Sequence, residues 1–172
     1  MPRILTPALI ALALSGCSTV DSRTSTLGTA QLAGSDGRVV GSAVLYRRAG
    51  ETTVSVTISG TPGTVHGMHL HTVGKCEAPF TSAGPHLNPG GHQHGKENPQ
   101  GAHLGDLPNV SIDKTGQGTA SASLGPDAAA IDAALFDSDG TALVLHAAAD
   151  DYRTDPSGNS GARIACGVIK RS

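Results

Sequence analysis

The sequence predicts an all-β fold, an antiparallel sandwich or barrel, and three observations lead to it. Short runs alternate apolar and polar residues with a period of two, as strands with one buried face do. The 172 residues include 23 Gly and 10 Pro, so much of the chain must form turns and loops. Aromatic residues make up 2% of the chain and Trp is missing, so the core must consist of Val, Ile, Leu and Ala, which favours short packed strands.

Six runs carry the strand signal in a chain whose length favours one domain. They lie at residues 43–46, 54–58, 110–112, 120–124, 142–145 and 164–169. Gly50-Glu51 predicts the turn before the second run, and Lys114-Thr115-Gly116 predicts the turn after the third. Residues 126–135 are rich in Ala, which favours a helix by propensity, but we expect a connector with at most a helical turn.

The first residues indicate a targeting segment, so we expect residues 1–16 to be a signal peptide. Arg3 gives a positive start, and the mostly apolar residues 4–14 are too few to span a bilayer. Leu14-Ser15-Gly16-Cys17 resembles a bacterial lipoprotein processing site, which would make Cys17 the acylated first residue. An ordinary signal peptide with a chance Cys is the alternative.

We expect residues 17–26 to be a lipidated, small and polar tether, and residues 27–172 to be the folded domain. The absence of Asp after Cys17 favours, by the same family analogy, the outer membrane over the inner one. The formal net charge of −2 offers no basic surface for nucleic acid. If Cys17 carries lipid, Cys76 and Cys166 remain as a pair, and export permits a disulfide between them.

Histidines point to a metal, because seven of the eight lie within residues 66–103 and the eighth is His146. The stretch from Thr72 to Asn109 has no strand period and is rich in Gly, Pro and His. Unstructured loops longer than about 12–15 residues are uncommon unless they are functional or disordered. We therefore expect metal ions or a disulfide to hold this loop.

The histidines fall into two candidate ligand sets. His69 and His71 lie two apart on an expected strand and so share a face, and His146 follows another apolar run that could bring it near. Three imidazoles on strands suit copper, zinc or iron. The loop offers a second set, typical of tetrahedral zinc: His86, His94, His103 and Asp106.

The motifs around these residues resemble the copper/zinc superoxide dismutase family. They are residues 66–71, 84–89, 94–95, 103–109 and 161–169, and the resemblance covers roughly residues 27–170. It implies a flattened antiparallel Greek-key β-barrel or sandwich with long metal-binding and active-site loops. It also implies one copper and one zinc per subunit, and disproportionation of superoxide to dioxygen and hydrogen peroxide in the periplasm.

The resemblance implies a role for each matching residue. The copper ligands would be His69, His71, His86 and His146. The zinc ligands would be His86, His94, His103 and Asp106. His86 would bridge both metals and carry a proton during turnover, and Arg163 would attract and orient superoxide. Asp150 would join His69 to His94 by hydrogen bonds, and Cys76 and Cys166 would form the family's disulfide.

Other residues near these motifs have simpler interpretations. We expect His66 to be hydrogen-bonded, Met68 to lie in the core and His92 to be exposed. Lys75 and Lys96 are expected to be ordinary surface residues. The loop between His146 and Arg163 is shorter than in the animal enzymes of the family, so their substrate-steering charges have no clear counterparts here.

Two other functions are compatible with the same ligands. A non-catalytic periplasmic copper- or zinc-binding protein would need neither Arg163 nor Asp150. A zinc hydrolase built on His69, His71 and His146 would lack an evident general base. The expected partners are superoxide and, through the N-terminal lipid alone, a membrane. The resemblance allows either a monomer or a homodimer.

Overall fold

The structure is a computed structural model that describes residues 23–172. The predicted signal peptide, Cys17 and most of the predicted tether lie outside this range. Among the described residues, no helix has the length and apolar character needed to cross a membrane.

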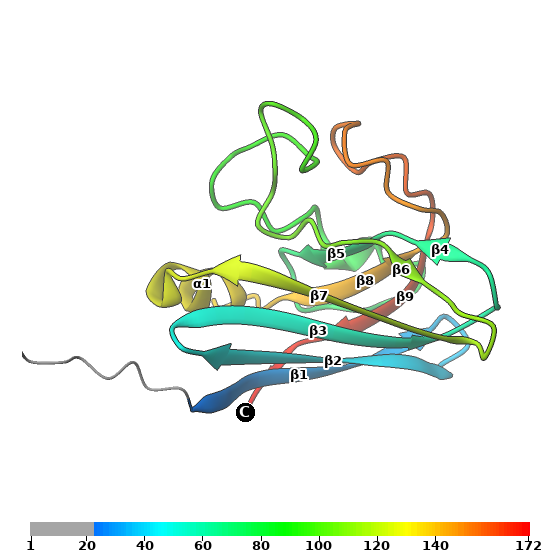
Figure 1. Cartoon of the computed structure of the whole chain (residues 1–172), viewed down its shortest axis with the longest axis horizontal. Coiled ribbons are helices and arrows are strands. Elements are labelled where there is room, and N and C mark those ends of the chain that lie inside the picture. Colours follow the sequence, from blue (N-terminus) through cyan, green and yellow to red (C-terminus); the bar gives the residue numbers. More distant parts are fainter. Residues whose placement is uncertain (1–22) are drawn as a thin grey trace, which may run out of the picture.

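The main element is one curled antiparallel sheet, whose strands run lengthwise across Figure 1. Its strands are β1 (Thr24–Gly34), β2 (Val39–Arg48), β3 (Glu51–Ser59), β5 (Met68–His71), β7 (Gln117–Gly125), β8 (Ala142–His146), β9 (Arg163–Val168) and β10 (Lys170–Arg171). The order across the sheet is β5-β8-β9-β1-β2-β3-β7, with β10 paired to β1. A separate pair consists of β4 (Val65–His66) and β6 (Val110–Ser111). The predicted all-β class is confirmed.

The sheet begins earlier than the sequence predicted. Thr24, Ser25 and Thr26 belong to β1 and pair with residues 46–48 of β2. The strand β1 therefore begins three residues before the expected start of the folded domain, because its pairing with β2 continues to the end of that strand.

The core lies inside the curl of the sheet and is aliphatic. Val54, Val56 and Ile58 of β3 are almost fully buried, while the alternating Thr53 and Ser55 face outward, as the period of two predicted. Leucines from strands, loops and the helix complete the core: Leu32, Leu45, Leu70, Leu87, Leu107, Leu135 and Leu143. The rigid ligand-bearing strands are thus backed by close packing.

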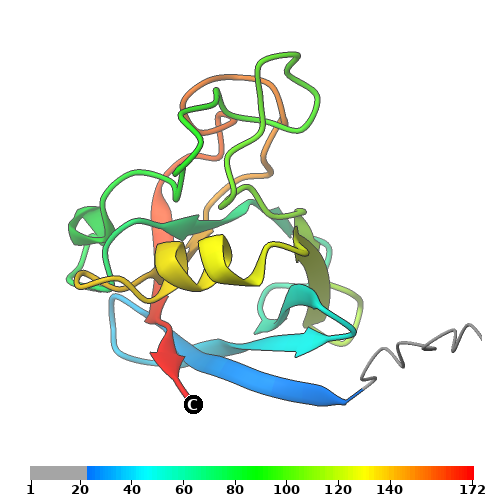
Figure 2. The same ribbon diagram turned by 90° about the vertical axis from the view of Figure 1, so that its left-hand side faces the viewer.

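The helix α1 (Ala128–Leu135) lies across one end of the curled sheet, as Figure 2 shows. Asp127 caps it by accepting a hydrogen bond from the Ala130 N–H at 3.1 Å. Ile131 and Leu135 are buried in the core, and Arg47 of β2 forms a 2.8 Å ion pair with Asp132. The helix is longer than the single turn expected, because this packing stabilises eight residues that propensity alone would leave marginal.

Two long loops rise from the same side of the sheet, residues 72–109 and 147–162 (Figure 1). The Cys76–Cys166 disulfide ties the first of them to β9, which confirms the predicted pair. Around it lies a small second cluster of buried side chains, formed by Phe80, Ala83, Ala142 and Val144. The two loops meet above β5 and β8, where the predicted ligands lie.

Candidate metal centre

The strands β5 and β8 position three of the predicted ligands. His69 and His71 occupy alternate positions of β5, His146 ends the paired strand β8, and all three side chains are buried. Because residues two apart on a strand share a face, the rings of His69 and His71 lie on the same side of the sheet.

Main-chain hydrogen bonds lay the long loop along the free edge of β5. The Leu70 N–H donates to Gly105 O (2.9 Å), and the Leu87 N–H donates to Leu70 O (2.8 Å). A side chain on Gly105 would overlap the Leu70 carbonyl oxygen, so glycine is required at this approach. These contacts place the neighbouring residues His86 and Asp106 directly opposite His71 and His69.

The strand histidines each donate one ring N–H to a fixed oxygen. The bonds run from His69 Nε2 to Asp150 Oδ2 (2.7 Å), from His71 Nδ1 to Gly84 O (2.8 Å), and from His146 Nδ1 to Gly161 O (3.2 Å). The other nitrogen of each neutral ring therefore carries a lone pair. Within residues 23–172 these three buried nitrogens have no hydrogen-bond partner.

These nitrogens belong to what we call the first group: His69, His71, His86 and His146. One ligand atom from each of the four lies within 4.8 Å of all the others. Buried nitrogen lone pairs normally have partners, and imidazole is a preferred ligand of copper, zinc and iron. The first group therefore fits a transition-metal ion.

The second group shares His86 with the first and comprises His86, His94, His103 and Asp106. The Nδ1 atoms of the three histidines lie 3.0, 3.0 and 3.1 Å from Asp106 Oδ1. Donor atoms around tetrahedral zinc, each about 2.0–2.1 Å from the ion, are about 3.3 Å apart. The second group therefore fits zinc with little rearrangement. A ligand atom of His69 also lies near this group. We assign His69 to the first group, in which its ring stacks on the ring of His86.

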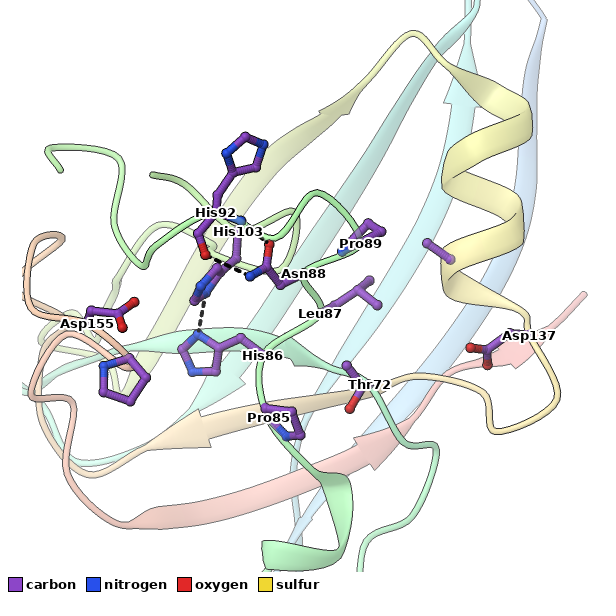
Figure 3. Close-up of a pocket in the computed structure, with 12 residues that line it drawn as sticks. Thr72, Pro85, His86, Leu87, Asn88, Pro89, His92, His103, Asp137 and Asp155 are labelled. Carbon is purple, nitrogen blue, oxygen red and sulfur yellow. Dashed lines mark hydrogen bonds between the residues drawn. The ribbon is translucent and has the colours of Figure 1, made fainter. Parts of the chain in front are cut away.

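A hollow of about 530 Å³ reaches the second group from outside (Figure 3). The rings of His86 and His103 face each other in it, whereas His92 points away from both and is exposed. His92 is therefore not a member of either group, as predicted.

Asp150 connects the two groups. Its side chain is fully buried, with Oδ2 bonded to His69 Nε2 and Oδ1 accepting from His94 Nε2 at 3.0 Å. Oδ1 also accepts the Tyr152 N–H, and the Asn109 side chain makes two hydrogen bonds to the Asp150 main chain. One carboxylate thus fixes a ring of each group.

Burial and charge set opposite protonation states in the metal-free centre. Burial lowers the pKa of His71 to about 2, of His146 to about 3 and of His86 to about 4. Burial also opposes a proton on His94, but the hydrogen bonds and charges of Asp106 and Asp150 outweigh it and raise the pKa of His94 to about 9. His94 is therefore a cation at neutral pH in the metal-free centre, at a position where zinc would bind.

We expect the metal-free protein to be most stable at about pH 7. Below that pH the unfolded chain protonates His71, His86 and His146 while the folded chain keeps them neutral, so stability falls as the pH drops. Above it, His94 keeps its proton only in the folded chain, so its contribution is lost as the pH rises toward 9. Urea denaturation from pH 4.5 to 9.5 measures this. A free energy of unfolding that still rises from pH 7 to 9 would contradict it.

A second hollow, of about 410 Å³, opens beside the first group. It is lined by Thr81, Gly84, Pro85, His86, His146, Pro156, Ser157, Gly161 and Arg163. Arg163 is its one permanent charge, and its guanidinium donates to the carbonyls of Phe80 and Gly84 at 2.7 Å. The hollow therefore offers a small anion a cationic wall next to His86 and His146.

The model of one protein family, described as copper/zinc superoxide dismutase (SODC), matches residues 39–169. The chain belongs to the copper/zinc superoxide dismutase family. The family accounts for both ligand groups, since its members take copper and zinc.

Relatives and solved structures agree with the family. The chain is 40% identical over 146 residues to superoxide dismutase (Cu-Zn) 2 of Aquifex aeolicus, covering 82% of this chain and 85% of that one. It is 38% identical over 148 residues to superoxide dismutase (Cu-Zn) of Caulobacter vibrioides, covering 83% and 84%. A superoxide dismutase-like protein from Bacillus subtilis has a similar structure, with a TM-score of 0.76, 34% identity, and coverage of 85% and 100%. The copper/zinc superoxide dismutase of Brucella abortus gives a TM-score of 0.65 at 28% identity, covering 86% and 100%.

The structure brings together all the ligands that the family resemblance names, with Asp150 and Arg163 beside them, while Cys17 lies outside the described residues. His66 is hydrogen-bonded, as predicted, to the His146 carbonyl and to Thr64, and Met68 is in the core. The surface lysines are engaged, Lys75 with Glu77 and Lys96 over the Tyr152 ring.

Sequence reasoning missed Asn109, Tyr152 and Asp155, which join the two loops. The Tyr152 hydroxyl accepts the Asn109 N–H at 2.7 Å, and Asp155 accepts the His94 N–H at 2.6 Å. The sequence signal that could have found this contact is Tyr152, because the chain has only two tyrosines and this one lies in a polar loop.

Proposed function

We propose that the protein is a superoxide dismutase that converts two superoxide anions and two protons into dioxygen and hydrogen peroxide. The first group would hold copper and the second group zinc. The observation that carries the proposal is that both groups share His86. Its Nδ1 lies 3.0 Å from Asp106 Oδ1 in the second group, and the same residue belongs to the first group and lines the second hollow.

When bound, copper supplies reversible one-electron transfer and zinc supplies a fixed positive charge. The residues of the chain do the rest. Arg163 binds and orients the superoxide anion in the hollow beside His86 and His146. His86, which lines this hollow, can hold a proton on its Nε2 and deliver it to the reduced oxygen. Asp150 and the Gly84 carbonyl keep the rings of His69 and His71 oriented.

Loading the protein with copper and zinc tests the proposal. Loaded protein should suppress the reduction of cytochrome c by a superoxide-generating system, and elemental analysis should give about one copper and one zinc per chain. Protein that binds both metals but leaves cytochrome reduction unchanged would refute the dismutase and favour a copper- and zinc-binding protein without catalysis.

We also propose that the domain is exported to the periplasm and anchored through a lipid on Cys17, in the outer membrane. The Leu14-Ser15-Gly16-Cys17 sequence supports the anchor, and the Cys76–Cys166 disulfide supports an oxidising compartment. Mass spectrometry of the mature N-terminal peptide tests this. A chain beginning at Met1, or an unmodified Cys17, would contradict it.

A further inference from the structure

Gly158 lies on the second long loop, residues 147–162, where hydrogen bonds fix both its N–H and its carbonyl. It is buried and has a left-handed φ of +62°. Its N–H donates to the Thr154 carbonyl at 2.6 Å, and its carbonyl accepts the Asp151 N–H at 2.9 Å. Because both main-chain groups are bonded, this residue has little freedom to move away from what it faces.

Gly158 faces the hydrogen bond that joins the two ligand groups. A Cβ atom at this position would overlap Asp150 Oδ1 and would lie 2.5 Å from Asp150 Cγ and 2.7 Å from His94 Nε2. These are the carboxylate and the ring nitrogen that form the 3.0 Å bond between Asp150 and His94. Only a hydrogen atom fits at this point.

The alternative to moving Gly158 is to move Asp150, and that carboxylate is constrained as well. Its main chain is bonded twice to the Asn109 side chain, and its Oδ2 is bonded to His69. A methyl group on Gly158 would therefore push Oδ1 away from His94 while the rest of Asp150 stays in place.

We propose that Gly158 is a positioning residue for zinc: its missing side chain lets Asp150 hold the His94 ring in the orientation that ligates the ion. The inference rests on the proposed second group. Hydrogen-bond partners of ligating histidines typically account for 10- to 100-fold in metal affinity.

Zinc affinity of the full chain, first stripped of metal, tests this by competition with a chromophoric chelator. We expect Gly158→Ala to raise the zinc Kd about 10- to 100-fold. Gly91→Ala is the matched control, because Gly91 has a φ of +64° on the exposed zinc loop and a Cβ atom there would have no other atom within 4 Å. Gly91→Ala places a side chain on a backbone with the same left-handed φ, but the added methyl group contacts nothing. The zinc Kd of this variant should stay within about threefold of the wild-type value.

Cobalt(II) in the zinc position gives a second readout, because its visible absorption reports ligand geometry. We expect that spectrum to change in Gly158→Ala and to stay unchanged in Gly91→Ala. If Gly158→Ala only destabilised the loop at another place, its cobalt(II) spectrum would match that of the wild type, which would contradict the inference.

A double variant tests whether Gly158 acts through Asp150. Asp150→Ala removes the overlapping carboxylate, so adding Gly158→Ala to it should raise the zinc Kd by a clearly smaller factor than Gly158→Ala does in the wild-type background. If Gly158→Ala raises the zinc Kd by the same factor in the wild type and in Asp150→Ala, the inference is wrong. Wild-type protein that binds no zinc would refute the proposed function, whereas equal zinc affinity of wild type and Gly158→Ala would refute this inference alone.

Discussion

Replacing Arg163 with Glu is expected to lower kcat/KM for superoxide about 100-fold while copper content stays near that of the wild type. Arg163 is the one permanent charge lining the hollow beside His86 and His146, so the substitution turns an attractive wall into a repulsive one. Charge in such a cleft changes association rates by about 10- to 1,000-fold. Pulse radiolysis measures kcat/KM, and elemental analysis measures the copper.

Two comparisons separate charge from packing in this experiment. Arg163→Lys keeps the charge but cannot span the Phe80 and Gly84 carbonyls as the guanidinium does, so it should retain intermediate activity. Raising the ionic strength should reduce the difference in kcat/KM between wild type and Arg163→Glu, because salt screens the interaction between residue 163 and superoxide. Equal kcat/KM in wild type and Arg163→Glu would remove Arg163 from the mechanism.

Removing the Cys76–Cys166 disulfide is expected to lower the free energy of unfolding by about 4–5 kcal/mol, the largest effect on stability that we foresee. The bond closes a sequence separation of 90 residues, and opening it returns that freedom to the unfolded chain. Guanidinium denaturation of metal-free protein with Cys76→Ser and Cys166→Ser, compared with the wild type, measures the change.

Wild-type protein kept reduced is the control for this measurement, because it lacks the bond but carries no substitution. Activity should fall together with stability in the disulfide variant. The loop that Cys76 anchors carries Phe80 and Gly84, whose carbonyls hold the Arg163 guanidinium. A loss below about 1 kcal/mol would mean that metal-free protein orders this loop without the bond.

Most of the fold was predictable because β-strands with one buried face leave a period of two in the sequence. The alternation at Val54, Val56 and Ile58 is an example. The start of β1 was not predictable, because Thr24–Thr26 are small polar residues typical of a tether. They belong to a strand only because they pair with β2. The extent of α1 was missed for a related reason: Arg47, which bonds to it, lies 85 residues from Asp132 in the chain.

The candidate ligands were predictable from residue type, spacing and motif, but the contacts that orient them were not. Asn109 and Gly158 are common residue types, and their roles arise only when the two long loops come together around Asp150. Single-sequence reasoning has no access to such contacts, because Asn109 lies 41 residues from Asp150 and Gly158 lies on the other long loop from the His94 ring that it faces.

The way the long loop lies against β5 has a consequence for where this protein can be labelled. Main-chain bonds at Leu70, Leu87 and Gly105 fix both flanks of the loop, and the second loop grips His94 from the other side. The tip at residues 89–91 is a small turn that the Asn88 side chain closes onto His92. Among the described contacts, none of residues 89–91 forms a hydrogen bond to a ligand, so this tip is the suitable point for attaching a probe near the metals.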